Sequence, residues 1–456
     1  MNRADIQGLL FSGYSAQPAS ALLRIEFASG FPNAWLRRTL PQISSGATSE
    51  RSDPCRVNLA FTFVGLEKLG LPPASLAEFS DEFRQGMAHP ERAAVLGDLG
   101  PNHPSTWEFS DRDARAVDGA LFVYAPSAQE LGTKLEEEQQ ALARFGLECA
   151  VLHTYLPRDG REHFGFRMSV SQPFVRGIER GRARRPRLAT GEFLLGYEDG
   201  VGDLTLRPGV PPRRTTREPL KGFGLDRQAS FGFNGSYLVL RKLEQRVDAF
   251  RAFLGHAERH SVSRELCAAK LVGRWPNGAS LALHPEREPG SSESEARFGY
   301  RELDPLGYGC PLGAHVRRAN PRDALSGDAR ESERHRLLRR GRLYGPERDA
   351  EGEANERGLL FLALNADLGR QFEYVQNRLA VAQGSLSLRG ETDAFLGSSG
   401  PGEKGLRHFT LPAEPVRKRL FGLPDLVRAR GGLYGFLPSL RALGYLADLA
   451  EARALP

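Results

Sequence analysis

The sequence predicts an α+β fold in which antiparallel sheets are covered by helices. Short apolar runs typical of strands are each followed by a longer segment with apolar residues at helical spacing. The order of these segments is irregular, unlike the regular strand–helix alternation of a doubly wound parallel sheet. The chain therefore favours sheets built from antiparallel strands, with the helices packed on their faces.

Five apolar runs are predicted as strands: residues 21–27, 57–66, 119–125, 236–243 and 358–366. Three amphipathic segments of helix-favouring composition are predicted as helices: residues 75–87, 129–146 and 243–255. In each half of the chain, two strands flank a long irregular insertion. The two halves therefore echo one another, although too loosely to count as a sequence repeat.

The chain length predicts two domains. Its 456 residues are about three times the usual domain size. A stretch rich in Pro, Arg and Gly at residues 205–225 is typical of a linker. We expect an N-terminal half at 1–205 and a C-terminal half at 225–456.

The composition excludes several classes of protein. Lys and Arg number 62 and Asp and Glu 56, and the resulting net charge of +6 is too weak to indicate nucleic-acid binding. The sequence shows neither a signal peptide nor an apolar stretch of membrane-spanning length. The four cysteines are far apart and form no metal or disulfide framework. We therefore expect a cytoplasmic protein with reduced thiols and no membrane partner.

Several short motifs carry little weight. Gly222-Phe-Gly224 lacks the third glycine of a dinucleotide-binding loop, and neither a P-loop nor an H-E-x-x-H helix is present. The stretch Gly196 to Gly200 places two acids beside glycines. A polar turn is its more common meaning, and a catalytic pair of acids is the alternative.

The second half contains a more informative set of residues. His315 lies between a Gly-containing approach and a basic stretch, and further cations follow at residues 335–345. A predicted strand at 359–365 leads into a predicted helix that carries Glu373. A lone histidine is more often structural, but a histidine, a carboxylate and a cation cluster near one strand suit a metal ligand, an orienting acid and an anion clamp.

The motifs together resemble the dye-decolorizing (DyP-type) haem peroxidases. The resemblance rests on CPLGAHVRRANPR, HRLLRRGRLYG and GLLFLALNADLGRQFEYVQ, with KLVGRWPNG, ADIQGLLFSGY, GEFLLGY and FLPSLRAL in family order. It covers nearly the whole chain. It implies two ferredoxin-like halves, one haem b per chain, and hydrogen peroxide and an organic electron donor as reactants.

The resemblance also implies roles for single residues. His315 matches the histidine that binds the haem iron, and Glu373 matches the carboxylate that hydrogen-bonds to that histidine. Arg339 matches the catalytic arginine that stabilises the leaving hydroxide. On charge and location, Arg274 and Arg322 are expected at the haem propionates.

The distal motif departs from the family pattern. Members read G-x-x-D-G followed by I-S-Q-P, whereas this chain reads His163-Phe-Gly-Phe-Arg-Met168-Ser169-Val-Ser-Gln172-Pro. Met168 replaces the aspartate and Ser169 replaces a glycine. The residues on both sides match the family, and Gln172, which is one of them, is expected among the cofactor-binding residues. A thioether has no proton to give, so proton transfer would fall to Arg339, a nearby histidine or water.

Three functions remain open at this point. The first is an atypical haem peroxidase that retains His315 and Arg339. The second is a haem protein without competent peroxidase activity, used in sensing, storage or electron transfer, in which Met168 ligates or shields the iron. The third is a scaffold that has lost haem. A homo-oligomer is left open.

Overall fold

The structure is a computed structural model of the whole chain. It describes residues 1–27, 30–48, 54–112, 115–178, 187–205, 208–211, 220, 229–290, 298–325, 329–347, 356–382, 388, 390–397 and 407–449. All structural statements below concern these residues.

The N-terminal half contributes one set of four antiparallel strands. They are β1 (Ala19–Glu26), β2 (Arg56–Phe61), β3 (Gly119–Ala125) and β4 (Glu148–Tyr155), in the spatial order β2-β3-β1-β4. The connection from β1 to β2 contains helix α1 (Pro32–Thr39), and that from β3 to β4 contains helix α6 (Ala128–Arg144). This β-α-β-β-α-β order with the first and third strands central is the ferredoxin-like arrangement.

The C-terminal half repeats the arrangement. Its strands are β7 (Ser236–Gln245), β9 (Arg342–Tyr344), β10 (Gly358–Asn365) and β13 (Val427–Leu437), in the spatial order β13-β7-β10-β9. The short strand β8 (Leu338–Arg339) also pairs with β10. The sequence-based expectation of two ferredoxin-like halves is therefore confirmed.

The two strand sets join into one closed ring. β13 meets β2 through a single pair, Phe436 opposite Phe61, and β4 meets β9 through Tyr155 opposite Leu343. Each strand set therefore meets the other at both of its edges, and each of these two contacts is a single residue pair. The expected division at residues 205–225 falls mostly outside the described residues and stays a prediction.

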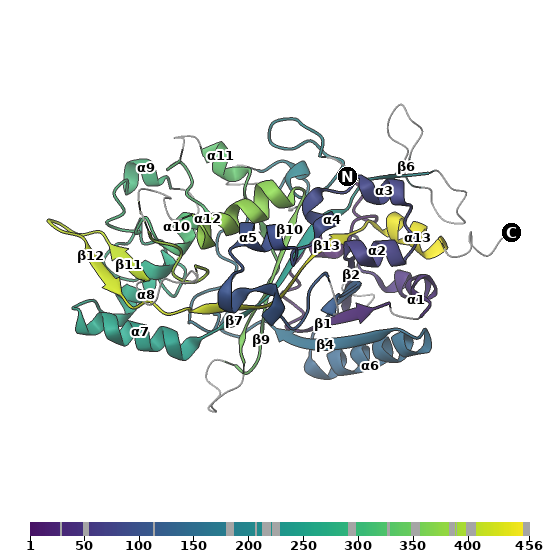
Figure 1. The fold of residues 1–456 in the computed structure, drawn as a ribbon, viewed down its shortest axis with the longest axis horizontal. Helices are drawn as coiled ribbons and strands as arrows, with labels where there is room; N and C mark the ends of the chain where they lie inside the picture. Colours follow the sequence, from purple (N-terminus) through teal and green to yellow (C-terminus); the bar gives the residue numbers. More distant parts are fainter. Residues whose placement is uncertain are drawn as a thin grey trace.

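Helices cover the ring on its outside (Figure 1). The long helix α6 packs on β1, β3 and β4, while α7 and α8 pack together at the opposite end of the molecule (Figure 1). The helices are α1, α2 (Phe63–Lys68), α3 (Pro73–Ala77), α4 (Asp81–Gln85), α5 (Pro90–Leu96), α6, α7 (Val247–Arg259), α8 (Arg264–Val272), α9 (Tyr300–Leu303), α10 (His315–Ala319), α11 (Ala329–Glu333), α12 (Tyr374–Ala380) and α13 (Leu440–Asp448). Small strands are β5 (Gly209–Val210), β6 (Ala229–Ser230), β11 (His408–Leu411) and β12 (Lys418–Phe421).

Two predicted elements are interrupted in the structure, and the helix expected at 243–255 begins later, at Val247, because strand β7 continues to Gln245. The strand expected at 57–66 ends at Phe61, because the Thr62 hydroxyl accepts a hydrogen bond from the Gly65 amide and starts helix α2. The helix expected at 75–87 is split into α3 and α4, and extended backbone at Ser80 separates them. In both places the apolar pattern continues across a break in the backbone.

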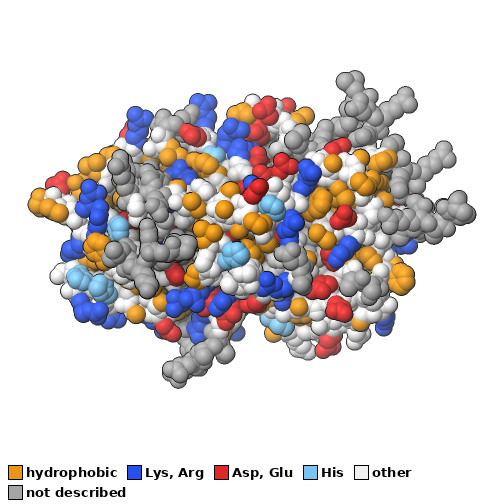
Figure 2. All heavy atoms as spheres, viewed as in Figure 1, with side chains coloured by type: hydrophobic (Ala, Val, Ile, Leu, Met, Phe, Trp, Pro, Cys, Tyr) orange, Lys and Arg blue, Asp and Glu red, His pale blue; other side chains and the backbone are white. Residues whose placement is uncertain are grey.

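The surface has a mixed character. On the face drawn in Figure 2, basic and acidic side chains are interspersed, with hydrophobic side chains among them. All four cysteines are free thiols. Within the described residues, no helix is both long enough and apolar enough to cross a membrane.

Candidate active site

His315 is the first residue of helix α10 and its imidazole is held by an acid. The ring Nδ1 lies 3.1 Å from each carboxylate oxygen of Asp393. An ionised carboxylate can only accept, so this contact places the proton on Nδ1. In the neutral ring, Nε2 then carries the lone pair, which is the state that a histidine needs in order to bind a metal.

Asp393 is fixed in its own turn. One of its oxygens accepts hydrogen bonds from the backbone amides of Phe395 and Leu396, at 3.0 and 2.8 Å. Burial alone would raise the pKa of the Asp393 carboxyl, but the attraction and hydrogen bond of His315, the Leu396 amide and the nearby Arg318 together lower it. The carboxylate is therefore held ionised behind the imidazole.

The expectation that Glu373 is the acid partner of His315 is wrong. Glu373 accepts a hydrogen bond from the Tyr434 hydroxyl at 2.8 Å and forms an ion pair with Arg92 at 3.0 Å. It is the last residue of a π-helical turn, Leu368–Glu373, and its register directs it toward β13 and α5. Burial is the main cause that raises the pKa of Glu373. Asp393 takes the position behind the imidazole that the family resemblance assigns to Glu373.

A cavity of about 130 Å³ lies in front of His315 and collects three of the predicted residues. Arg274, Arg322 and Arg339 all line it. Burial lowers the pKa of the Arg339 and Arg322 guanidinium groups, and the like charge of Arg274 lowers both further. Cations crowded in a desolvated space favour an anionic ligand, which would relieve their repulsion.

Each of these arginines is oriented by a backbone carbonyl. Arg274 donates to Gly278 at 2.7 Å, and Arg339 donates to Val170 at 2.8 Å. The guanidinium of Arg322 donates to the Phe298 carbonyl and lies 3.9 Å from the centre of the Phe298 ring. Its backbone has a φ of +55°, a conformation that costs free energy in a non-glycine residue.

The turn that contains Met168 reaches the cavity through a different residue. Val170 and Ser171 line the cavity, whereas Met168 is not among the described lining residues. Ser169 has a φ of +61°, so the backbone keeps a left-handed conformation at the position where the family motif has glycine. Met168 is half-buried, and its amide donates to the Gly160 carbonyl.

Gln172 positions the backbone of Arg339. Its side-chain amide donates to the Arg339 carbonyl at 3.1 Å, and its oxygen accepts from the Arg339 amide at 3.3 Å. Gln172 also lines a second, half-open cavity of about 310 Å³, which shares Ser171, Asn320, Arg322 and Arg336 with the first. The two cavities are therefore neighbours, and Gln172 links the turn of Met168 to strand β8.

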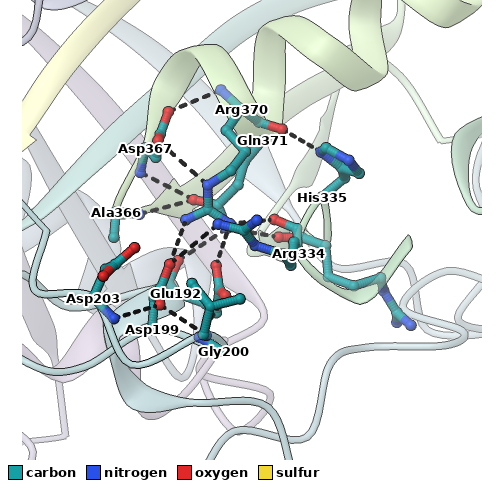
Figure 3. Close-up of polar contacts among 12 residues, drawn as sticks. Glu192, Asp199, Gly200, Asp203, Arg334, His335, Ala366, Asp367, Arg370 and Gln371 are labelled. Atoms are coloured by element: carbon teal, nitrogen blue, oxygen red, sulfur yellow. Dashed lines mark hydrogen bonds and ion pairs between the residues drawn. The ribbon is translucent and has the colours of Figure 1, made fainter. Parts of the chain in front are cut away.

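The stretch Gly196 to Gly200 forms a polar turn. The Asp199 carboxylate accepts from the amides of Val201 and Asp203 and forms ion pairs with Arg334 and Arg370, at 3.4 and 3.8 Å. Among the described residues it lines neither cavity. Asp199 therefore belongs to a network of charges beside the site, which Figure 3 shows.

In the sequence, His335 is only part of a cationic stretch, yet in the structure it lines the same cavity as His315. Its Nδ1 donates to the Arg370 carbonyl at 2.5 Å, and its ring stacks on Tyr374 with 3.6 Å between the ring centres. Burial lowers the pKa of His335. The signal in the sequence that points to His335 is its position, four residues before Arg339.

The donor set fits a haem. Iron in a haem needs only one protein ligand on the side where a histidine binds, because the macrocycle supplies four nitrogens. Nε2 of His315 would be that ligand, and Arg274 and Arg322, which line the same cavity, would supply cations for the carboxylates of a porphyrin. The described residues contain no group of three or more His, Cys, Asp or Glu side chains arranged to hold a metal ion by themselves.

Comparison with known proteins gives a consistent picture. The family model described as Dyp-type peroxidase, C-terminal, matches residues 224–395. The chain is 27% identical to Peroxidase 2 of Mycetinis scorodonius, over 97% of this chain and 87% of that protein. It is 31% identical to a multifunctional dye peroxidase of Amycolatopsis sp., over 62% of this chain and 61% of that protein.

Solved structures share the fold. The crystal structure of a DyP-type peroxidase from Anabaena sp. matches with a TM-score of 0.79 and 24% identity, over 97% of this chain and 94% of that one. A DyP-type peroxidase from Auricularia auricula-judae matches with a TM-score of 0.76 and 20% identity, over 98% and 99% of the two chains. Both halves of the chain therefore have counterparts in one known architecture.

Proposed function

The chain belongs to the DyP-type peroxidase family, and we propose that it is a haem-dependent peroxidase with an atypical distal site. Its reactants are hydrogen peroxide and an organic electron donor. Bound haem would supply the redox chemistry, in which electrons from the donor reduce the peroxide to water.

One observation carries this proposal. A single cavity brings together His315, backed by Asp393, and the three guanidinium groups of Arg274, Arg322 and Arg339. The imidazole would hold the iron through Nε2, and the Asp393 carboxylate strengthens it as a donor by holding the Nδ1 proton. Arg274 and Arg322 would pair with the propionates, and one haem b per chain would satisfy these groups.

Arg339 is assigned to the peroxide. Its positive charge would stabilise the hydroxide that leaves when the peroxide O–O bond breaks. Its guanidinium donates a hydrogen bond to the Val170 carbonyl, and the Gln172 side chain donates one to its backbone carbonyl. These two hydrogen bonds fix the position of Arg339. A side chain that is already oriented loses no free energy to reorganisation during the reaction.

Met168 makes the distal site atypical. A thioether sulfur is a weak acceptor and carries no proton, so it cannot take the peroxide proton and return it. The general acid–base contribution, about 10²–10⁴-fold in typical enzymes, must then come from another group. We propose that Met168 marks the loss of the family's acid.

The same cavity supports a second candidate function. No Asp or Glu is present among the described residues that line it. A haem protein without an efficient proton acceptor would serve sensing, storage or electron transfer in place of peroxide turnover. In that case Met168 would either shield the iron or, after a movement of its turn, ligate it.

Absorption spectra test these functions directly. The protein loaded with haem is expected to show a Soret band, and His315→Ala is expected to lose it at equal protein yield. Peroxide-dependent oxidation of a dye then separates a peroxidase from a haem protein of another kind. A wild-type protein that binds no haem would contradict the proposal, as would His315→Ala with a normal haem content.

A further inference from the structure

His335 lines the cavity, and no hydrogen bond to a described residue engages its Nε2. Its Nδ1 hydrogen is donated to the Arg370 carbonyl, which places the proton on Nδ1 and the lone pair on Nε2. The ring lines the same cavity as Arg339 and His315. A neutral imidazole with a fixed tautomer is the usual form of a general base in proteins.

The chain segment that carries His335 is anchored on both sides. The Arg370 side chain donates to the Arg334 carbonyl at 2.9 Å, and the Gln371 amide donates to the Arg336 carbonyl at 3.0 Å. Arg336 itself donates to Ser171, in the turn of Met168, at 2.6 Å. Three consecutive residues are therefore held in place, which gives the ring of His335 a defined position.

A charged network behind the ring supports this anchor. Figure 3 shows the Arg370 side chain directed toward Glu192 and Asp199, while its backbone carbonyl faces His335. The Arg370–Glu192 ion pair has a length of 2.7 Å and is largely buried. The residues Leu368–Glu373 form a π-helical turn, a rare geometry that is often found at functional sites. The turn places Arg370 and Gln371 where both can bind the 334–336 segment.

The other polar residues that line the cavity are poor proton acceptors. Guanidinium groups have no lone pair to offer, and burial raises the pKa of Tyr300 so far that its phenol stays protonated. Asn320 is an amide and Ser171 an alcohol. His315 is committed through Nδ1 to Asp393 and through Nε2 to the expected iron. Among the described residues that line the cavity, His335 is left as the basic group.

We propose that His335 is the proton acceptor for hydrogen peroxide in this cavity, in the role that the family assigns to the aspartate replaced by Met168. The O–H bond of the peroxide breaks, its electron pair stays on oxygen, and Nε2 of His335 takes the proton. The O–O bond of the peroxide breaks, and the same proton returns to the departing oxygen, which leaves as water. This step rests on the proposed function, in which the haem and the organic donor would supply the two electrons.

The charges around His335 agree with this role. Burial and the positive charges of Arg370 and Arg378 lower the pKa of His335. The hydrogen bond to the Arg370 carbonyl and the charge of Glu331 act in the opposite direction, but the net shift is downward. The cavity adds further cations at Arg274, Arg322, Arg336 and Arg339. The imidazole is therefore neutral at pH 7, and the cations stabilise the peroxide anion that its action produces.

Two variants test the proposal in the haem-loaded protein. In His335→Asn the amide nitrogen stands at the same distance along the side chain as Nδ1, so the bond to the Arg370 carbonyl can persist while Nε2 is deleted. In His335→Gln a neutral amide replaces Nε2. His153→Asn, at an exposed position on β4, is the matched control.

Two rapid-mixing measurements are made over a range of pH. We expect both His335 variants to react with hydrogen peroxide about 10²–10⁴-fold more slowly than the wild type at neutral pH. The second readout is the association rate of cyanide, because hydrogen cyanide must also give up a proton on binding. In the wild type this rate is expected to fall as the pH drops through the pKa of His335, and in the variants that ionisation disappears.

The outcomes separate the two proposals. Wild-type rates and an unchanged cyanide profile in His335→Asn at full haem content would overturn the role of His335 and leave the peroxidase intact. A wild type without a Soret band would overturn the proposed function instead. If both variants fail to fold, the wild-type cyanide profile decides alone, since a profile with no ionisation in the histidine range also overturns the proposal.

Discussion

Replacing Asp393 by asparagine tests the acid partner that the structure gives to His315. The retained Oδ1 can still accept from the Phe395 and Leu396 amides, so the turn keeps its hydrogen bonds. The new amide NH₂ would replace Oδ2, so the Nδ1–H of the imidazole keeps only the neutral Oδ1, which two backbone amides already share, as its acceptor. A neutral amide oxygen holds this hydrogen less strongly than a carboxylate does, so the tautomer with its hydrogen on Nε2, which cannot bind iron, becomes more populated.

The expected size of the effect follows from this contact. Loss of a carboxylate that orients a metal-binding histidine typically costs about 10–100-fold in affinity. This corresponds to about 1.4–2.8 kcal/mol in the free energy of binding. Asp393 is fully buried near Arg318 and Arg407, so we also expect a lower free energy of unfolding in Asp393→Asn.

Haem transfer to an excess of apomyoglobin, followed in the Soret region, measures the release rate. We expect faster release from Asp393→Asn and an unchanged rate from Glu373→Gln. The second variant is the matched control because the family resemblance suggested Glu373, whereas the structure pairs it with Tyr434 and Arg92. Fast release from Glu373→Gln with normal release from Asp393→Asn would refute the reasoning.

Three further outcomes are expected. At pH values where His335 is protonated, Met168→Asp should react with peroxide at least about tenfold faster than the wild type, because general acid–base catalysis typically contributes about 10²–10⁴-fold. Rapid mixing across pH measures this rate, and an equal rate in the two proteins would show that another group carries the proton. Ser169→Gly should raise the free energy of unfolding by about 0.5 kcal/mol in urea titrations, because glycine adopts the observed φ of +61° without strain. The pKa of Asp199 is held low, despite burial, by two backbone amides and by the cations Arg370 and Arg334. Its carboxylate therefore adds stability above the pKa of the unfolded state, and this stability is lost as the pH falls through the pKa of the folded state. Asp199→Asn should flatten the acid limb of a curve of stability against pH, and an unchanged limb would contradict the direction of this pKa shift.

The sequence predicts more of the fold than of the site. Apolar runs located the central strands, since a strand buried on both faces leaves a continuous hydrophobic signature. The pattern failed at Thr62, where a hydroxyl cap starts a helix inside an apolar run. Caps of this kind depend on one side chain and leave hydrophobicity unchanged.

The site was predicted only where its residues lie in strong motifs. His315 and Arg339, identified by the resemblance, and Arg274 and Arg322, identified by charge and location, line one cavity, and their roles there stay predictions. Asp393 was missed because it stands alone in a segment without periodicity, and its role exists only after the chain returns to α10. The direction of Glu373 depends on a π-helical turn, whose extra residue per turn rotates every later side chain.

Closure of the strand ring has a consequence for synthesis of the chain. The ring is completed by β13, which pairs with β7 and also meets β2, made more than 350 residues earlier in the chain. During translation, β2 and β7 therefore present unpaired edges after all the residues expected to hold haem have emerged from the ribosome. Unpaired edges invite association between nascent chains. Early docking of the cofactor would order the C-terminal half during this interval, so haem supply is expected to govern the yield of correctly closed protein.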